Sequence, residues 1–153
     1  MSHNNKIIVR QASLADATLI APLFDAYRQF YQQTSNIELA QQFIHERLAR
    51  QESVIYLALN TQDKILGFTQ LYPTFESIRA TRSFILNDLY VYPELRGQGL
   101  ATALLNAAKE HAILCGAQSL ELSTAINNPA QKLYRAQGYI LDTIYHHYSL
   151  TLD

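Results

Sequence analysis

The stretch Asn87–Gly116 reads NDLYVYPELRGQGLATALLNAAKEHAILCG, and it joins a strand-like run to a helix-like run. Gly97 and Gly99 lie at the junction beside Arg96, and the helix-like run begins without an acidic residue. Leucine and alanine recur there at helical spacing, which predicts a helix over Arg96–Cys115. Backbone without side chains at such a junction has three possible explanations: it binds a phosphate, it makes a tight turn, or it has no particular role.

Outward from this junction the chain alternates between strand-like and helix-like runs. Runs of β-branched and aromatic residues predict strands, and apolar residues at 3.6-residue spacing predict helices. We expect Pro22 to interrupt or kink the first helix. The expected strands cover residues 6–12, 53–60, 64–75, 81–91, 118–124 and 138–152, the last as one long or two short strands, and the expected helices cover 14–33, 37–50, 96–115 and 128–137.

The resulting order is β-α-α-β-β-β-α-β-α-β(β). Consecutive strands in the middle favour an antiparallel meander, and the later strand-helix-strand units favour parallel pairing. We therefore expect a mixed α/β sheet (an α+β arrangement). No repeat, linker or low-complexity tract interrupts the sequence, so we expect one domain over residues 1–153.

Composition is that of an ordinary globular protein. Of 153 residues, 48% are hydrophobic and 16% charged, and 12 Lys and Arg nearly balance 13 acids. The near-zero net charge therefore provides no overall electrostatic attraction to nucleic acid or to an anionic membrane. No run approaches the ~18 apolar residues of a membrane span. The single cysteine, Cys115, fits a reducing compartment, so we expect a cytoplasmic protein with neither nucleic-acid nor membrane partners.

The start of the expected helix has the features of an anion site. A helix begins with about four amides that lack intrahelical partners, and glycines let a phosphate approach them closely. The backbone from Gly97 to Ala101 could line a pyrophosphate, with Arg96 adding a charge. A P-loop is excluded because its spacing and lysine are missing. The dinucleotide fingerprint fits partly: Thr102 replaces the third glycine, although Glu121 lies where a ribose-binding acid would be expected.

Two motifs together resemble one family. NDLYVYPELRGQGLATALL is similar to the acetyl-CoA signature of the GNAT superfamily of N-acetyltransferases, and NNPAQKLYRAQGY is similar to its second signature. The expected order of elements also matches that family. The resemblance implies acetyl-CoA as co-substrate and direct transfer of its acetyl group to an amine. It is closest to the diamine (spermidine/spermine) acetyltransferase branch. No residue cluster has metal-ligand spacing, so we expect no metal.

The resemblance also implies where the cofactor binds. The glycine turn would hold the pyrophosphate through backbone amides. In the family, the preceding strand splays from its neighbour and bonds the pantetheine arm, and the amide of Val91 would face the thioester oxygen. The residue matching Asn127 touches the same arm. The expected cofactor-binding residues are Leu89, Tyr90, Val91, Arg96, Gly97, Gln98, Gly99, Leu100, Ala101, Asn127 and Tyr134.

Catalytic roles are carried over at two positions. Tyr134 matches the tyrosine that protonates the leaving thiolate, and a phenol with pKa near 10 stays protonated at neutral pH. The diamine branch carries an acidic pair where this chain has Asn87-Asp88, and Asn87 cannot take a proton. Asp88 could act as the base, a water chain could carry the proton, or the amine could arrive neutral. Strand alternation predicts opposite faces for Asn87 and Asp88, so that only one meets the substrate.

In the family, the first helix and the end of the third strand wall the acceptor site. An aromatic wall with a few acids suits an organic cation. A small primary amine is therefore the expected partner; a peptide amine or a non-catalytic acyl-CoA-binding module is the alternative. By family analogy the C-terminal strands could form a homodimer. The expected substrate-binding residues are Tyr27, Tyr31, Tyr72, Phe75 and Asn87.

Overall fold

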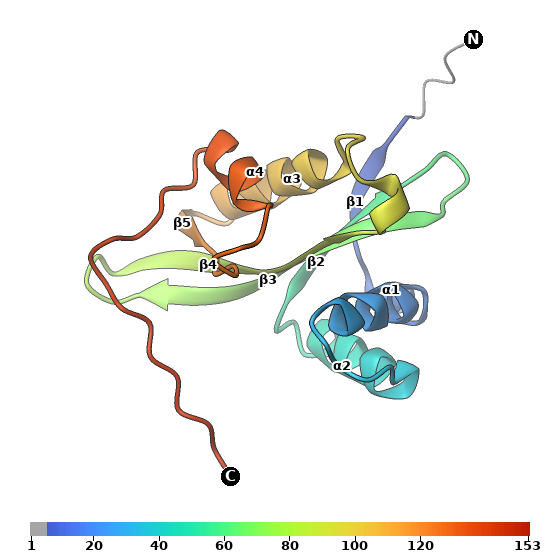
Figure 1. Ribbon diagram of the computed structural model, residues 1–153, viewed down its shortest axis with the longest axis horizontal. Coiled ribbons are helices and arrows are strands. Elements are labelled where there is room, and N and C mark those ends of the chain that lie inside the picture. Colours follow the sequence, from blue (N-terminus) through green and yellow to red (C-terminus); the bar gives the residue numbers. More distant parts are fainter. Residues whose placement is uncertain (1–5) are drawn as a thin grey trace. The chain divides into compact units, whose positions relative to one another are not determined.

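The computed structural model describes residues 6–153, which form two compact units divided between Ser123 and Thr124. The first unit contains a five-stranded sheet and three α-helices of 13 to 15 residues, shown in Figure 1. Short 3₁₀ turns at Leu14–Asp16 and Pro93–Leu95 precede α1 and α3. The elements are β1 Ile8–Gln11, α1 Ala17–Phe30, α2 Ile37–Ala49, β2 Val54–Leu59, β3 Ile65–Glu76, β4 Thr81–Val91, α3 Leu100–Leu114 and β5 Ala117–Glu121.

The sheet has the order β1-β2-β3-β4-β5. The first four strands pair antiparallel, and β5 pairs parallel to β4 after the α3 crossover. Short turns can join antiparallel neighbours, whereas a parallel pair needs a longer connection such as a helix. The predicted mixed α/β sheet, with its antiparallel meander and later parallel pair, is confirmed.

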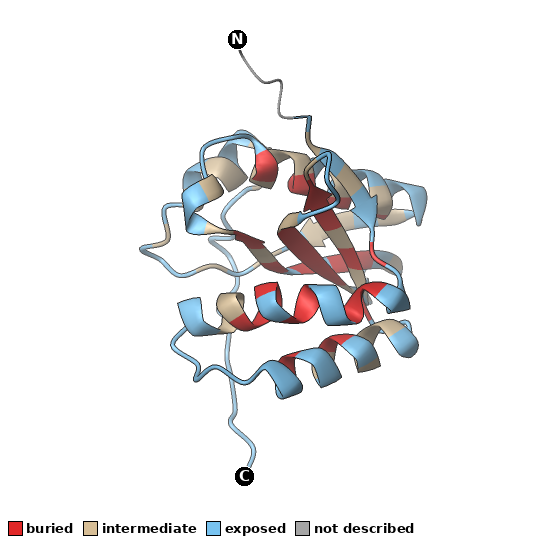
Figure 2. Ribbon diagram, turned by 90° about the vertical axis from the view of Figure 1, so that its right-hand side faces the viewer, coloured by how far each residue is buried: buried red, intermediate tan, exposed pale blue. Residues whose placement is uncertain are grey.

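Helices cover both faces of this sheet. Figure 1 shows α1 and α2 on one side and α3 on the other, and Figure 2 shows that buried residues concentrate on the strands and the facing helix surfaces. The two apolar layers hold the strands between them, so β4 is fixed where it approaches the glycine turn. One layer includes Ile20, Leu23, Ile44, Leu57 and Phe68, and the other includes Ala58, Val91, Leu100 and Leu104.

Two predicted helix boundaries need correction. Helix α1 continues from Ala17 through Pro22 without a break. Pro22 lies on the exposed side, where water can satisfy the carbonyl that loses its partner. Helix α3 begins at Leu100 and not at Arg96. Arg96 is extended (ψ 156°), and Gly99 takes a left-handed conformation, so the helix cannot start earlier.

The second unit contains one short helix, α4, at Gln131–Ala136. The predicted closing strand or strands over 138–152 are wrong: the structure assigns no strand there. The side chain of Asp142 accepts hydrogen bonds from the N–H groups of Ile144 and Tyr145, at 2.8 and 3.2 Å. This local turn competes with an extended ladder. Over residues 6–153, none of the helices has the length and apolar character to cross a bilayer.

Candidate active site

The start of α3 has the backbone geometry of an anion site. Gly97 and Gly99 have φ values of +79° and +84°, a region that other residues enter only with strain. A Cβ built at either glycine would meet no atom within 4 Å, so the turn is open above both. No side chain caps the helix at Gly99. The free amides of the first turn can therefore receive an external anion.

Arg96 holds this turn against the end of β4. Its Nε donates to the carbonyl oxygen of Val91 at 3.1 Å, and its guanidinium lies over the rings of Phe30 and Tyr90, at 5.4 and 5.6 Å. Arg96, which was predicted to add positive charge beside a phosphate, therefore also connects the turn to the strand. Its positive charge stays beside the open amides.

The end of β4 is free on one side. Its pairing with β5 stops at Ile85 opposite Glu121, so no described strand flanks Leu89–Val91 on that side. The N–H of Tyr92 bonds the carbonyl of Leu66 on the β3 side, at 3.3 Å. Neighbouring peptide groups in a strand point to opposite sides. The N–H of Val91 therefore points away from β3, toward the side that β5 does not reach.

Gly67 on β3 sets how closely β3 and β4 approach at this point. It pairs with Val91, and a Cβ at Gly67 would lie 2.8 Å from the carbonyl oxygen of Tyr90. Only glycine fits without moving one of the strands. Sequence reasoning passed over Gly67, although a glycine inside a strand is a signal for such a close approach.

A β-bulge brings Asn87 and Asp88 together. Gln70 pairs with Asp88 and Leu71 pairs with Leu86, which leaves Asn87 without an opposite residue. The predicted opposite orientation of Asn87 and Asp88 is therefore wrong, because the extra residue interrupts the alternation. The amide of Asn87 donates to Asp88 Oδ1 at 2.7 Å.

Asp88 is a buried carboxyl with several hydrogen-bond donors. It is 2% exposed, and Gln70 Nε2 donates to its Oδ2 at 2.5 Å. Burial raises the pKa of Asp88, and hydrogen bonds from Asn87 and Gln70 oppose that rise. A carboxylate with a raised pKa is a stronger base near neutral pH. Gln70 Oε1 is buried without a hydrogen-bond partner among the described residues, so this cluster retains a free acceptor.

Tyrosine side chains lie near this carboxyl. Tyr27 donates its hydroxyl proton to the carbonyl of Asn87 at 3.3 Å and contacts the ring of Tyr31, with centroids 5.1 Å apart. Burial and the nearby Asp88 raise the pKa of Tyr27, and they raise the pKa of Tyr72 to about 12. Tyr27 thus contacts the Asn87-Asp88 pair directly, Tyr72 lies within reach of the Asp88 charge, and Tyr31 packs against Tyr27.

Phe75 lies away from the Asp88 cluster. It is five residues beyond Gln70 on β3, about 17 Å along an extended strand. The residue is 72% exposed, and its ring centroid lies 5.7 Å from the guanidinium of Arg82. Of the five predicted substrate-binding residues, Phe75 is the one that the fold separates from the others.

Residues Asn127 and Tyr134 belong to the second unit. There the side chain of Asn128 accepts from the N–H of Ala130 at 2.9 Å, which leaves the exposed side chain of Asn127 unused as a cap. The ring of Tyr134 lies against that of Tyr139, with centroids 5.9 Å apart. The roles expected for Asn127 and Tyr134 stay predictions.

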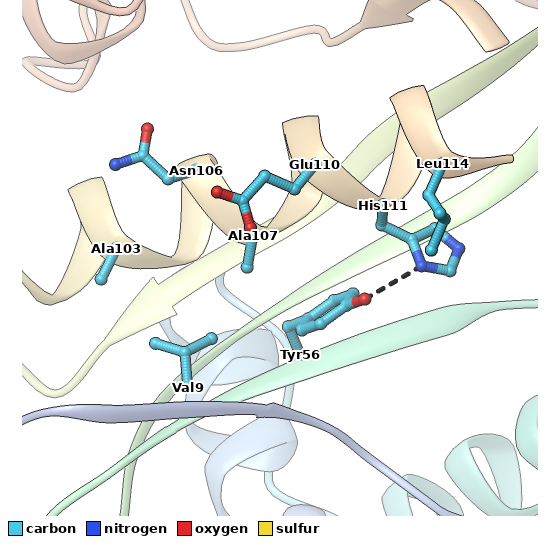
Figure 3. A pocket seen from close by; sticks show the side chains of 8 residues that line it. All are labelled: Val9, Tyr56, Ala103, Asn106, Ala107, Glu110, His111 and Leu114. Carbon is cyan, nitrogen blue, oxygen red and sulfur yellow. Dashed lines mark hydrogen bonds between the residues drawn. The ribbon is translucent and has the colours of Figure 1, made fainter. Parts of the chain in front are cut away.

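A separate groove of about 460 Å³ lies between α3 and strands β1 and β2, shown in Figure 3. Tyr56 and His111 hydrogen-bond across it at 2.9 Å, and burial lowers the pKa of His111. None of the predicted site residues lines this groove. Within residues 6–153, no three His, Cys, Asp or Glu side chains gather as metal ligands would. The groove's lining is Val9, Tyr56, Ala103, Asn106, Ala107, Glu110, His111 and Leu114.

The chain is similar to known acetyltransferases over most of its length. A profile of the acetyltransferase (GNAT) family matches residues 20–139. The uncharacterized N-acetyltransferase YhfO of Bacillus subtilis is 46% identical over 145 residues, which cover 94% of this chain and 97% of YhfO. The crystal structure of a probable acetyltransferase is 43% identical with a TM-score of 0.90, covering 95% of this chain and 98% of that one.

Two relatives with named substrates are similar over about half of the chain. The aminoalkylphosphonate N-acetyltransferase of Salmonella typhimurium is 34% identical over 77 residues, 50% of each chain. The thialysine N-epsilon-acetyltransferase of Bos taurus is 32% identical over 75 residues, 48% of this chain and 44% of its own. Because the family profile spans most of the chain and YhfO matches nearly all of it, this protein belongs to the acetyltransferase (GNAT) family.

Proposed function

We propose that the protein transfers an acetyl group from acetyl-CoA directly to a primary amine of a small molecule, either a polyamine or an amino-acid-like compound. One observation carries this proposal: a single strand segment, Leu89–Val91, joins a buried carboxyl to an open anion-binding turn. A base at one end and a phosphate anchor at the other are what amine acetylation from a CoA thioester needs.

At the donor end, the backbone does the binding. The residues present suit acetyl-CoA, because the uncapped start of α3 and its two left-handed glycines leave room for a pyrophosphate. The acetyl thioester supplies the activated carbonyl. The N–H of Val91 is directed away from β3, where it can donate to the carbonyl oxygen as negative charge develops there.

At the acceptor end, the Asp88 carboxylate takes the proton from the substrate ammonium. The nitrogen then bonds to the thioester carbon, the carbon–sulfur bond breaks, and the nitrogen loses a second proton, which replaces the one that Tyr134 would give to the thiolate. Burial, which raises the pKa of Asp88, makes it a suitable proton acceptor. Tyr27 and Tyr72 form an aromatic wall beside this carboxyl, as a cationic group prefers. Tyr134 is proposed to protonate the departing thiolate, and this role rests on its match to the family motif.

We also propose a homodimer formed through the C-terminal segment. Apolar side chains of this segment are exposed to solvent in the single chain: Ile140, Ile144 and Leu150 are 92%, 82% and 84% exposed. Such residues favour burial against a second copy of the chain. Sedimentation equilibrium would find a dimer, and a variant ending at residue 139 would be monomeric; a monomeric full-length chain would contradict this proposal.

The test measures release of free CoA thiol from acetyl-CoA with polyamines, amino acids and lysine peptides as acceptors. Turnover with small amines is expected. Asp88→Asn should lower kcat/KM by about 10²–10⁴-fold, the usual contribution of a general base. Asp63→Asn is the matched control, because Asp63 lies in the turn before β3 at a positive φ that Asn also tolerates. Turnover confined to peptides, or none with any acceptor, would contradict the proposed function.

A further inference from the structure

Arg47 on α2 has donors that its described neighbours do not use. Its Nη2 lies 3.2 Å from Glu46 Oε2 and 3.5 Å from Glu52 Oε1. Its Nε is buried and has no hydrogen-bond partner among the described residues. A buried donor of a charged group is costly to leave unpaired. The guanidinium is therefore suited to bind one more acceptor.

A continuous row of rings connects Arg47 to the Asp88 cluster. The guanidinium lies over the ring of Phe43 at 4.7 Å, and Phe43 stacks on Phe24 at 5.4 Å. Phe24 in turn stacks on Tyr27 at 6.1 Å, and the Tyr27 hydroxyl bonds the carbonyl of the residue before Asp88. A cation and a carboxyl thus lie at opposite ends of one aromatic row.

Tyr72 on β3 lies within the field of both charges. Its hydroxyl pKa is raised first by burial and then by Asp88, whereas the charge of Arg47 lowers it. Tyr72 is also two residues from Gln70, the partner of Asp88, so its side chain is on the same face of β3. Arg47 and Asp88 therefore both lie near the side chain of Tyr72.

We propose that Arg47 binds an anionic group of the acceptor, a carboxylate or a phosphonate, while Asp88 receives its amine. This inference rests on the proposed function and narrows its substrate class to amines that carry an anion. A guanidinium suits both groups because it can donate two parallel hydrogen bonds. It would repel the second ammonium of a polyamine. The two relatives with named substrates are named for an aminoalkylphosphonate and an amino acid.

The ion pairs with Glu46 and Glu52 offer a purely structural role for Arg47. Their side chains are 37% and 48% exposed, and exposed ion pairs contribute little to stability. They also engage Nη2 alone, which leaves Nε unexplained. A structural role and a substrate-binding role predict different kinetics, because only substrate binding distinguishes acceptors by their charge.

The experiment compares acceptors that differ in their anionic group. Lysine is paired with 1,5-diaminopentane, and 2-aminoethylphosphonate is paired with ethanolamine. Wild type should prefer the anion-bearing member of at least one pair. Arg47→Met should lower kcat/KM for that member by about tenfold to a hundredfold, chiefly through KM, and should not lower it for the member without an anion. The preferred member shows whether a carboxylate or a phosphonate is bound.

Two further variants complete the design. Arg50→Met is the matched control, since Arg50 is exposed at the end of the same helix, and it should leave both members of each pair unchanged. Arg47→Lys keeps the charge and should recover part of the preference; it also decides the matter if Arg47→Met does not fold. Wild type that prefers the amines without an anion, or Arg47 variants that slow both members equally, would overturn the inference alone. Absence of turnover with every amine would remove the proposed function with it.

Discussion

Gly67→Ala tests whether the packing of β3 against β4 positions the donor site. The added Cβ would lie 2.8 Å from the carbonyl oxygen of Tyr90 and 3.0 Å from Cγ2 of Val91. Ordinary contact begins at 3.4 Å, so the strands must separate by several tenths of an ångström. Overpacking of this kind costs about 1–3 kcal/mol, and at roughly 2–4 °C per kcal/mol the melting temperature should fall by about 2–12 °C.

The same shift should weaken acetyl-CoA binding. It moves the N–H of Val91, and a misplaced neutral hydrogen bond lowers affinity by roughly two- to tenfold. The assay follows thermal unfolding by circular dichroism and the KM for acetyl-CoA by release of free thiol. A rise in KM together with the lower melting temperature is the expected result.

Gly116→Ala provides the control for Gly67→Ala. Gly116 has a φ of +75° with no atom within 4 Å of the added Cβ, so the change costs about 1–2 kcal/mol through backbone strain alone. It follows the 15-residue α3, about 22 Å from the glycine turn, and should leave KM unchanged. Gly67→Ala with a lower melting temperature but the KM of wild type would refute the link between this contact and the cofactor. An unchanged melting temperature would refute the steric reasoning itself.

Three other variants test single side chains. Tyr134→Phe should greatly slow CoA release while acetyl-CoA still binds, as isothermal titration would report; unaffected turnover would remove its proposed role as the acid. Gln70→Leu removes a donor that lowers the pKa of Asp88, so the rise of kcat/KM with pH should move to higher pH; an unmoved profile would argue against Asp88 as the base. Arg10→Met tests the ion pair that lowers the pKa of Asp16 to about 2. Because the folded-state pKa is depressed, this pair stabilises the wild type above pH ~4, and its advantage in thermal unfolding should disappear between about pH 4 and 2; a gap independent of pH would contradict it.

Local patterns in the sequence were sufficient for most of the fold. The order of strands and helices through α4, the mixed sheet and the glycine turn before α3 all follow from periodicity and from residues with special backbone preferences. The final strand fails for a reason that periodicity cannot detect. Residues 138–152 have a strand-like sequence, but a strand also needs a partner for its backbone, and Asp142 bonds that backbone locally.

The site required contacts between residues distant in sequence. The bulge at Asn87 depends on its register against Gln70, so simple alternation gave the wrong face. The same long-range pairing makes Gln70 a donor to Asp88, which no motif in the sequence indicated. Arg96 was predicted from the motif, but its bond to the carbonyl of Val91 depends on how the turn folds back on the strand.

Because Asn87 lies opposite no residue of β3, its side chain is not part of the pairing that holds β4 in place. A residue outside the ladder can change its side chain without disturbing the pairing on either side, so an acid, an amide or a smaller group would leave β4 in place. Meanwhile the groups proposed to bind the cofactor are largely main-chain atoms, which such substitutions do not alter. The chemistry proposed for the acceptor side can therefore vary at position 87 while the backbone proposed for the donor side stays unchanged.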